Sequence, residues 1–402
     1  MSSHLRRLAL SVPVGVVGGL LSAAFLRVLE WTERTRTDAR WLVWFLPLAG
    51  LAVGFAYWRA GTAVAGGNAM LFDRVENHDR DVPFRLTPLV FCSSVVSHIA
   101  GASVGREGAA LQMTSGVVDG WGTRLGLSAR DKSFLLVSAI ASGFGSIVGA
   151  PIAGAVFALE VRRDGNTRLP AALPALVASA VGVATVEVLG IARTRFPAFP
   201  EISLGVDLFT RIAVASVLCG VLGLAFIVSI GGFRALLARV VTWPPLRPVV
   251  GGIVVLVLVV ALDLADMQGL SLHLAVEAQT QGTTLSDGVP GTLVREWWWK
   301  FVLTVVSVGS GFIGGEVVPL IVLGALSGAA VGHVTGGDVA LLAILGSVAM
   351  LAAGAKAPIA CAILGAELFG WSGFGIFLAA CLIARAASGR DSIYGRSVTR
   401  SS

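Results

Sequence analysis

Apolar residues are gathered into long runs along this chain, and short polar segments separate the runs. The runs cover roughly 8–29, 41–58, 86–103, 133–160, 171–191, 210–230, 248–265, 300–333, 339–368 and 371–387. A simple membrane-spanning helix needs about 20 apolar residues. Several runs are shorter, and others are cut by glycine or proline, as in 143–154 and 309–320. The pattern predicts an all-α membrane protein of short and interrupted helices, because irregular backbone within a bilayer must be buried or line a cavity.

The composition agrees with this prediction. Apolar residues make up 55% of the chain and charged residues only 13%, too little polar surface for a soluble domain of this size. Glycine accounts for 50 of 402 residues, which suits tightly packed membrane helices. No long polar stretch is present that could fold as a cytoplasmic regulatory domain, so we expect one membrane domain over 1–402.

The net charge of +6 does not indicate a nucleic-acid partner, because the basic residues are scattered between apolar runs as loop and headgroup charges. The four cysteines lie inside apolar runs without the spacing of a metal site, so we interpret them as structural and expect neither metal nor cofactor. Arg6 and Arg7 precede the first run, and no clear cleavage site follows it. We expect a first membrane or interfacial helix and a cytoplasmic N-terminus.

The chain contains an internal repeat. The motif Ala-Pro-Ile-Ala occurs at 150–153 and again at 357–360, and each copy leads to a glutamate, Glu160 or Glu367, with a common offset of 207 residues. Upstream, Glu107 and Glu316 lie 209 residues apart, each in a glycine-rich break. Nearly equal offsets at separate landmarks indicate duplication. We expect a first half over 1–200 and a second half over 201–402.

Duplicated membrane proteins with broken helices commonly bind substrate near the middle of the membrane, at the interface between the repeats. The helix N-termini that point inward there favour anions, through unpaired N–H groups and the positive end of the helix dipole. Glu107 lies in Gly-Arg-Glu-Gly (105–108), where an ionisable residue at membrane depth is a candidate for function. A glutamate beside an anion site competes with the anion when charged and carries a proton when neutral. The alternative is a loop-level ion pair between Arg106 and Glu107.

The motifs together resemble the CLC family of chloride channels and anion/proton antiporters. The matching segments are Gly-Arg-Glu-Gly followed by Gln112, Lys300 with Thr304, the glycine-rich break at 310–319 and the two Ala-Pro-Ile-Ala segments. They run in order from about residue 66 to Tyr394 and so cover most of the chain. The resemblance implies an inverted repeat of membrane helices and a homodimer with one anion pathway in each subunit.

The resemblance also assigns roles to particular positions. Glu107 stands where the family has its gating glutamate, and Tyr394 where it has an anion-coordinating tyrosine; without the family, Tyr394 is an interfacial anchor. Asn68 stands where the family has an anion-binding serine. We therefore expect the anion to be bound by residues of four segments, and the candidates are Asn68, Met70, Gly105, Gly108, Val318 and Tyr394.

Three departures resemble the fluoride/proton antiporter branch of the family. Asn68 replaces the serine, Glu316 replaces an apolar residue, and Val161 stands where chloride/proton antiporters have an internal glutamate. Val318 differs from this branch, which usually has threonine there. Fluoride is costly to dehydrate unless donors replace its water, and Asn68 offers two N–H donors where serine offers one hydroxyl. A protonated Glu316 would donate to fluoride and also move a proton.

Other polar residues are better explained by packing. The carboxyls of Glu160 and Glu367 are expected to form structural pairs, and Lys356 to reach an interface or a cytoplasmic vestibule. We expect Gln112 to bond backbone rather than ion, and we prefer a packing role for Met70. Thr304 and Ser310 are candidates for lining only, and the histidines (78, 98, 273 and 333) form no ligand set.

The sequence thus predicts a fluoride/proton antiporter of the CLC type, not an enzyme, in the plasma membrane of a prokaryote. Its expected partners are fluoride and protons, with chloride as an alternative anion, together with the lipid bilayer and a second copy of the chain. The alternatives are a chloride/proton antiporter or chloride channel of the same fold, an intramembrane enzyme with paired carboxylates, and an unrelated carrier for an organic acid. The sequence lacks a recognisable motif of such an enzyme, and a carrier for an organic acid would need a larger cavity.

Overall fold

The computed structural model describes residues 3–60, 64, 67–77, 81–161, 169–202, 205–280 and 290–396. Helices dominate these residues. The first eight are α1 (Ser3–Asp38), α2 (Leu46–Ala60), α3 (Gly67–Asn77), α4 (Leu86–Ile99), α5 (Glu107–Arg124), α6 (Ala129–Val148), α7 (Pro151–Glu160) and α8 (Leu169–Val188). The next eight are α9 (Val206–Val240), α10 (Leu246–Leu262), α11 (Leu272–Thr280), α12 (Pro290–Ser310), α13 (Val317–Thr335), α14 (Val339–Ala355), α15 (Pro358–Phe369) and α16 (Phe374–Ala387).

Short elements complete the description. Three 3-10 turns cover Arg40–Phe45, Ala265–Met267 and Trp371–Gly373, and a small hairpin pairs β1 (Asp391–Ser392) with β2 (Gly395–Arg396). Six helices of the described residues are long and apolar enough to cross a membrane, and several others are shorter apolar helices. The predicted runs 133–160 and 300–333 are each divided into two helices, so the expected interruptions are present.

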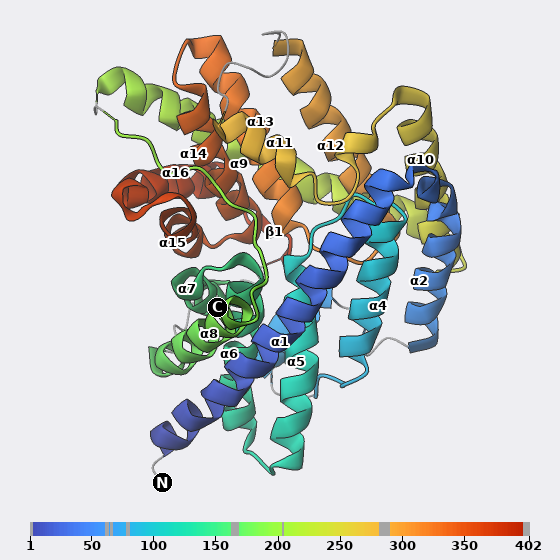
Figure 1. The fold of residues 1–402 in the computed structure, drawn as a ribbon, viewed down its shortest axis with the longest axis vertical. Helices are drawn as coiled ribbons and strands as arrows, with labels where there is room; N and C mark the ends of the chain where they lie inside the picture. The colour runs from blue at the N-terminus through green and yellow to red at the C-terminus, as the bar shows by residue number, and fades with distance from the viewer. Residues whose placement is uncertain are drawn as a thin grey trace, which may run out of the picture.

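The two series of helices each begin with their longest helix and share part of their packing scheme. Each opens with a helix of about ten turns, α1 or α9, and α1 packs on α6 and α8 as α9 packs on α14 and α16. In Figure 1, α2 and α10 stand side by side at one edge, while α7, α8, α15 and α16 gather toward the opposite edge. This correspondence supports the division into halves that we infer from the sequence repeat.

The two Ala-Pro-Ile-Ala segments start α7 and α15, and each helix is capped by the glutamate of the other half. The carboxylate of Glu160 accepts hydrogen bonds from the backbone N–H groups of Ile359 (3.0 Å) and Ala360 (2.6 Å). The carboxylate of Glu367 accepts from Ile152 (2.9 Å) and Ala153 (2.7 Å). Proline at the first helical position has no N–H to satisfy. The expected structural pairing is therefore reciprocal capping, with each negative charge at a positive helix end.

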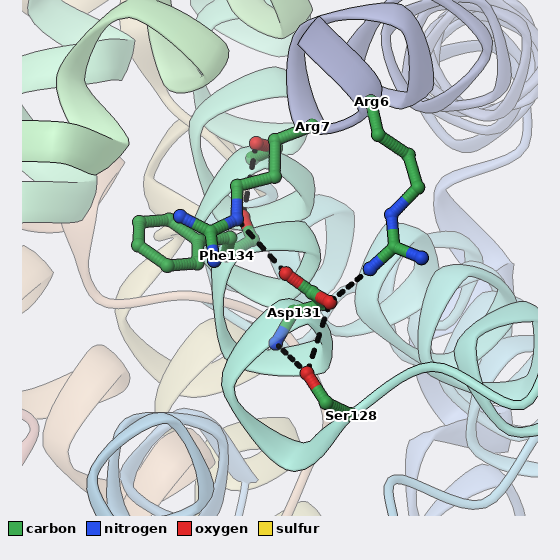
Figure 2. A network of polar contacts seen from close by, with 6 residues as sticks. Arg6, Arg7, Ser128, Asp131 and Phe134 are labelled. Carbon is green, nitrogen blue, oxygen red and sulfur yellow. Dashed lines mark hydrogen bonds and ion pairs between the residues drawn. The ribbon is translucent and has the colours of Figure 1, made fainter. Parts of the chain in front are cut away.

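The start of α1 is fastened to the start of α6 by charge (Figure 2). The Arg7 Nε donates to the Asp131 carboxylate at 2.9 Å, Arg6 pairs with the same carboxylate, and the Arg7 guanidinium lies 3.9 Å from the centroid of the Phe134 ring. Ser128 accepts a hydrogen bond from the Asp131 N–H and caps α6. The two arginines, which we expected to be loop and headgroup charges, are instead paired within the protein.

Removing one of the reciprocal caps should destabilise the protein. Replacement of Glu160 by Ala leaves two N–H groups at the start of α15 without their acceptor, at an expected cost of about 1–2 kcal/mol. The measurement is thermal unfolding in detergent, with Glu30→Ala as the control because Glu30 pairs with Arg34 on an exposed surface. Equal melting temperatures for the two variants would contradict the capping role.

Candidate functional site

Two glycine-rich breaks meet at the centre of the site. The Gly105 N–H donates to the Gly315 carbonyl at 2.6 Å and the Gly315 N–H donates to the Gly105 carbonyl at 2.8 Å, which forms an antiparallel bridge. A Cβ at position 105 would lie 2.7 Å from the Gly315 oxygen, and one at position 314 would lie 2.4 Å from the Val104 Cβ. Glycine is therefore required for this approach, which places the starts of α5 and α13 beside each other.

The helix starts present unpaired donors to this region. The first helical hydrogen bonds run from the Ala110 N–H to the Arg106 carbonyl in α5 and from the Leu320 N–H to the Glu316 carbonyl in α13. The preceding N–H groups of each first turn have no partner within their helix. In α13 these are the groups of Val317 and Val318, because Pro319 has none. Two helix starts in contact, each with N–H groups that have no partner within the helix, favour a negative group between them.

Glu107 begins α5 and is buried, with 2% of its surface exposed. Its carboxylate lies 3.5 Å from the Arg106 Nε and also interacts with the backbone N–H of Val318. The Arg106–Glu107 ion pair that we considered as an alternative does form, although it is buried and is not a surface loop pair. The carboxylate thus reaches from one helix start to the other and presents a negative oxygen where an anion would bind.

Asn68 approaches the same point from α3. The Gln112 Nε2 donates to the Asn68 Oδ1 at 3.2 Å and to the Gly108 carbonyl at 3.2 Å. A Cβ at Gly108 would lie only 2.5 Å from the Asn68 Nδ2. The amino group of Asn68 is therefore held against the first turn of α5. We expected Gln112 to bond backbone, which it does, but its bond to Asn68 was not predicted.

Tyr394 is buried in the protein interior and is not an interfacial anchor. Its ring makes edge contacts with Phe72 (centroids 5.0 Å apart) and Phe157 (5.9 Å). Its hairpin is attached to the second half by a hydrogen bond of 3.1 Å from the Ile393 N–H to the Gly354 carbonyl. The phenol lies within electrostatic range of both Glu316 and Glu107. The spacing of Asn68 and Phe72, one helical turn apart, could have indicated the shared face.

The remaining candidates are less closely associated with this point. Glu316 is half-buried at the N-cap of α13, without a capping bond from its side chain, and lies within electrostatic range of Arg234. The Val318 side chain is buried and apolar, so only the backbone at this position can donate. Met70 is half-buried against the hydrophobic core, and no contact places it with the carboxylates.

The other polar residues that we considered have local partners. The Lys356 Nζ donates to the Ser388 carbonyl (2.7 Å) and hydroxyl (2.6 Å), and Thr304 bonds the Ser103 hydroxyl at 2.8 Å. Ser310 donates to the backbone of its own helix. Within the described residues, no group of histidine, cysteine, aspartate and glutamate could hold a metal ion. His78 lies outside the described residues.

Comparison with known proteins identifies the architecture. The family described as "Voltage gated chloride channel" matches residues 49–389. This chain belongs to that family, the CLC family. A "Chloride/fluoride channel protein" of Pseudomonas syringae pv. tomato is 34% identical and aligns over 96% of this chain and 85% of its own. The chain is accordingly an all-α membrane protein with the inverted repeat of CLC transporters, a family of transporters and channels.

Solved CLC structures agree with the fold. The structure described as "Crystal structure of a CLC-type fluoride/proton antiporter" superimposes on this chain with a TM-score of 0.91 at 28% sequence identity. The match covers 98% of both chains. "X-ray crystal structure of a slow cyanobacterial Cl-/H+ antiporter" gives a TM-score of 0.82 at 20% identity, covering 98% of this chain and 97% of its own. The second likeness, at this low identity, concerns the CLC fold alone.

Replacement of Gly108 by Ala should impair anion transport. The added methyl would collide with the Asn68 amide, and overpacking of this kind typically costs about 1–3 kcal/mol, so we expect flux to fall about tenfold or more. Gly120→Ala is a matched control in the same helix, because a Cβ there meets nothing within 4 Å. Fluoride and chloride efflux from proteoliposomes measures both variants, and unchanged flux for Gly108→Ala would contradict the site.

Proposed function

We propose that this protein exchanges fluoride for protons across the plasma membrane of a prokaryote and so exports fluoride from the cell. The observation that carries the proposal is the position of the Glu107 carboxylate, which starts α5 and interacts with the Val318 N–H at the start of α13. A carboxylate oxygen in this place occupies the donors that a bound anion would need. Anion and charged carboxylate therefore compete for them.

This competition provides a route to coupling. When Glu107 accepts a proton it loses its charge, and its attraction to the helix starts and to Arg106 weakens. An anion can then take the donors while the neutral side chain turns aside with the proton. Return of the carboxylate displaces the anion and requires release of the proton. One side chain thus links movement of an anion in one direction to movement of a proton in the other.

The donor set suits fluoride. A small, strongly hydrated anion must find several hydrogen-bond donors in place of its water. The site offers the N–H groups of two helix starts and the Asn68 amino group, which is held beside Gly108. Tyr394 and Glu316 lie within electrostatic range of each other. Because position 161 has valine instead of a glutamate, the Glu316 carboxyl is the second group suited to handling protons.

The relatives support the same assignment by their names. The Pseudomonas syringae relative is called a chloride/fluoride channel protein, and the 28% identical solved structure is a fluoride/proton antiporter. Chloride/proton exchange or a chloride channel is the second candidate function, because Val318 adds no side-chain hydroxyl to the donor set. The assembly that we propose is a homodimer, with exposed apolar side chains of α8, α15 and α16 (Leu173, Ile359 and Leu382) available for contact.

Purified protein in liposomes should transport fluoride in preference to chloride. We expect initial efflux of fluoride to exceed that of chloride by at least about tenfold, corresponding to about 1.4 kcal/mol of discrimination. Proton movement in the opposite direction should accompany fluoride and should be driven by a fluoride gradient. Equal transport of chloride would contradict fluoride selectivity, while fluoride flux without proton movement would contradict exchange.

The two site glutamates should differ from other acidic residues in proton coupling. Glu107→Gln keeps the size of the side chain but cannot release a proton, so we expect anion flux to persist without proton transport. Glu316→Gln should weaken coupling, and Glu30→Gln, on an exposed surface of α1, should leave it unchanged. The measurement is the ratio of protons to fluoride moved, and a wild-type ratio in Glu316→Gln would remove that residue from the mechanism.

A further inference from the structure

Gln112 is a buried amide that connects two elements of the site. It lies on α5, one turn after Gly108, and only 5% of its surface is exposed. Its amino group bonds the Gly108 carbonyl and the Asn68 Oδ1, both at 3.2 Å, and Asn68 comes from α3, 44 positions earlier. A glutamine amino group carries two hydrogens. Both are therefore used, one within α5 and one across to Asn68.

The bond from Gln112 decides which end of the Asn68 amide faces the helix start. An asparagine side chain has an acceptor oxygen and a donor amino group on opposite sides, and rotation by about 180° about its last torsion exchanges them at little cost. Since the oxygen is bonded to Gln112, the amino group lies toward Gly108, where a methyl would be 2.5 Å from the Nδ2. The reverse orientation would present a negative oxygen to an anion.

We propose that Gln112 is a positioning residue that fixes Asn68 with its donors toward the anion and so sets preference for a small, strongly hydrated anion. The inference rests on the proposed function, in which Asn68 donates to the anion. Glutamate at 112 would offer only acceptors and would draw the Asn68 amino group away from the site. Methionine has a similar length and offers no donor, so it would leave the amide free to turn.

The test compares anion preference in proteoliposomes for wild type, Gln112→Met and Gln112→Glu. We expect the fluoride-to-chloride flux ratio to fall about three- to tenfold in Gln112→Met, the range of one lost hydrogen bond. The fall should be larger in Gln112→Glu. The matched control is Gln279→Met: Gln279 is a buried glutamine on α11 whose amino group bonds the Ser347 hydroxyl at 2.8 Å, so its replacement should preserve the ratio.

A double-mutant cycle with Asn68→Ala separates positioning from a general structural role. If Gln112 acts through Asn68, Gln112→Met adds no further change in the ratio when Asn68 is already alanine. An equal effect in both backgrounds, or a ratio within twofold of wild type in Gln112→Met, would overturn the proposal. Size-exclusion profiles and melting temperatures show whether each variant is folded, and Gln112→Glu provides the same comparison if Gln112→Met does not fold.

The test of Gln112 and the test of fluoride/proton exchange can fail separately. Wild-type protein that prefers chloride or moves no protons would refute fluoride/proton exchange. The cycle would still report whether Gln112 and Asn68 are coupled in the preference between anions, because it compares ratios among variants. Coupling together with fluoride preference in the wild type supports both proposals.

Discussion

The site depends on the direct backbone pairing of Gly105 with Gly315. Two N–H···O bonds of 2.6 and 2.8 Å join chain segments from the two halves at a point where side chains would collide. In a membrane these polar groups have no water to bond, so each break satisfies the other. Because both breaks lead directly into helices, the pairing brings two positive helix ends together, and the Glu107 carboxylate interacts with N–H groups of both.

The same exchange between halves recurs at α7 and α15. There the helix starts are bonded by side-chain carboxylates and not by backbone carbonyls. Glu160 accepts from N–H groups at the start of α15, and Glu367 accepts from those at the start of α7. The Glu107 carboxylate differs from these two in its surroundings. A capping carboxylate with two N–H partners stabilises the fold, whereas the Glu107 carboxylate lies beside Arg106 and the Val318 N–H, where we propose that an anion competes with it.

Much of this arrangement could be predicted from the chain, although some partners could not. The offsets between repeated motifs predicted the halves, and glycine-rich breaks predicted helix starts within the membrane. The bond between Gln112 and Asn68, the aromatic contacts of Tyr394 and the pairing of Arg6 and Arg7 with Asp131 were not predicted. Each of these contacts joins segments far apart in sequence, and spacing along one helix carries no information about them.

The sequence by itself determined the membrane class, the interrupted helices and the resemblance to CLC proteins, because apolar runs, glycines and repeated motifs are local properties of the chain. Only the tertiary structure decided which N–H groups each glutamate carboxylate contacts. Four glutamates stand at corresponding places in the two halves, yet Glu160 and Glu367 cap helices while Glu107 lies between two helix starts. The physical reason is that a carboxylate's role depends on which N–H groups surround it, and in this fold those groups come from the opposite half.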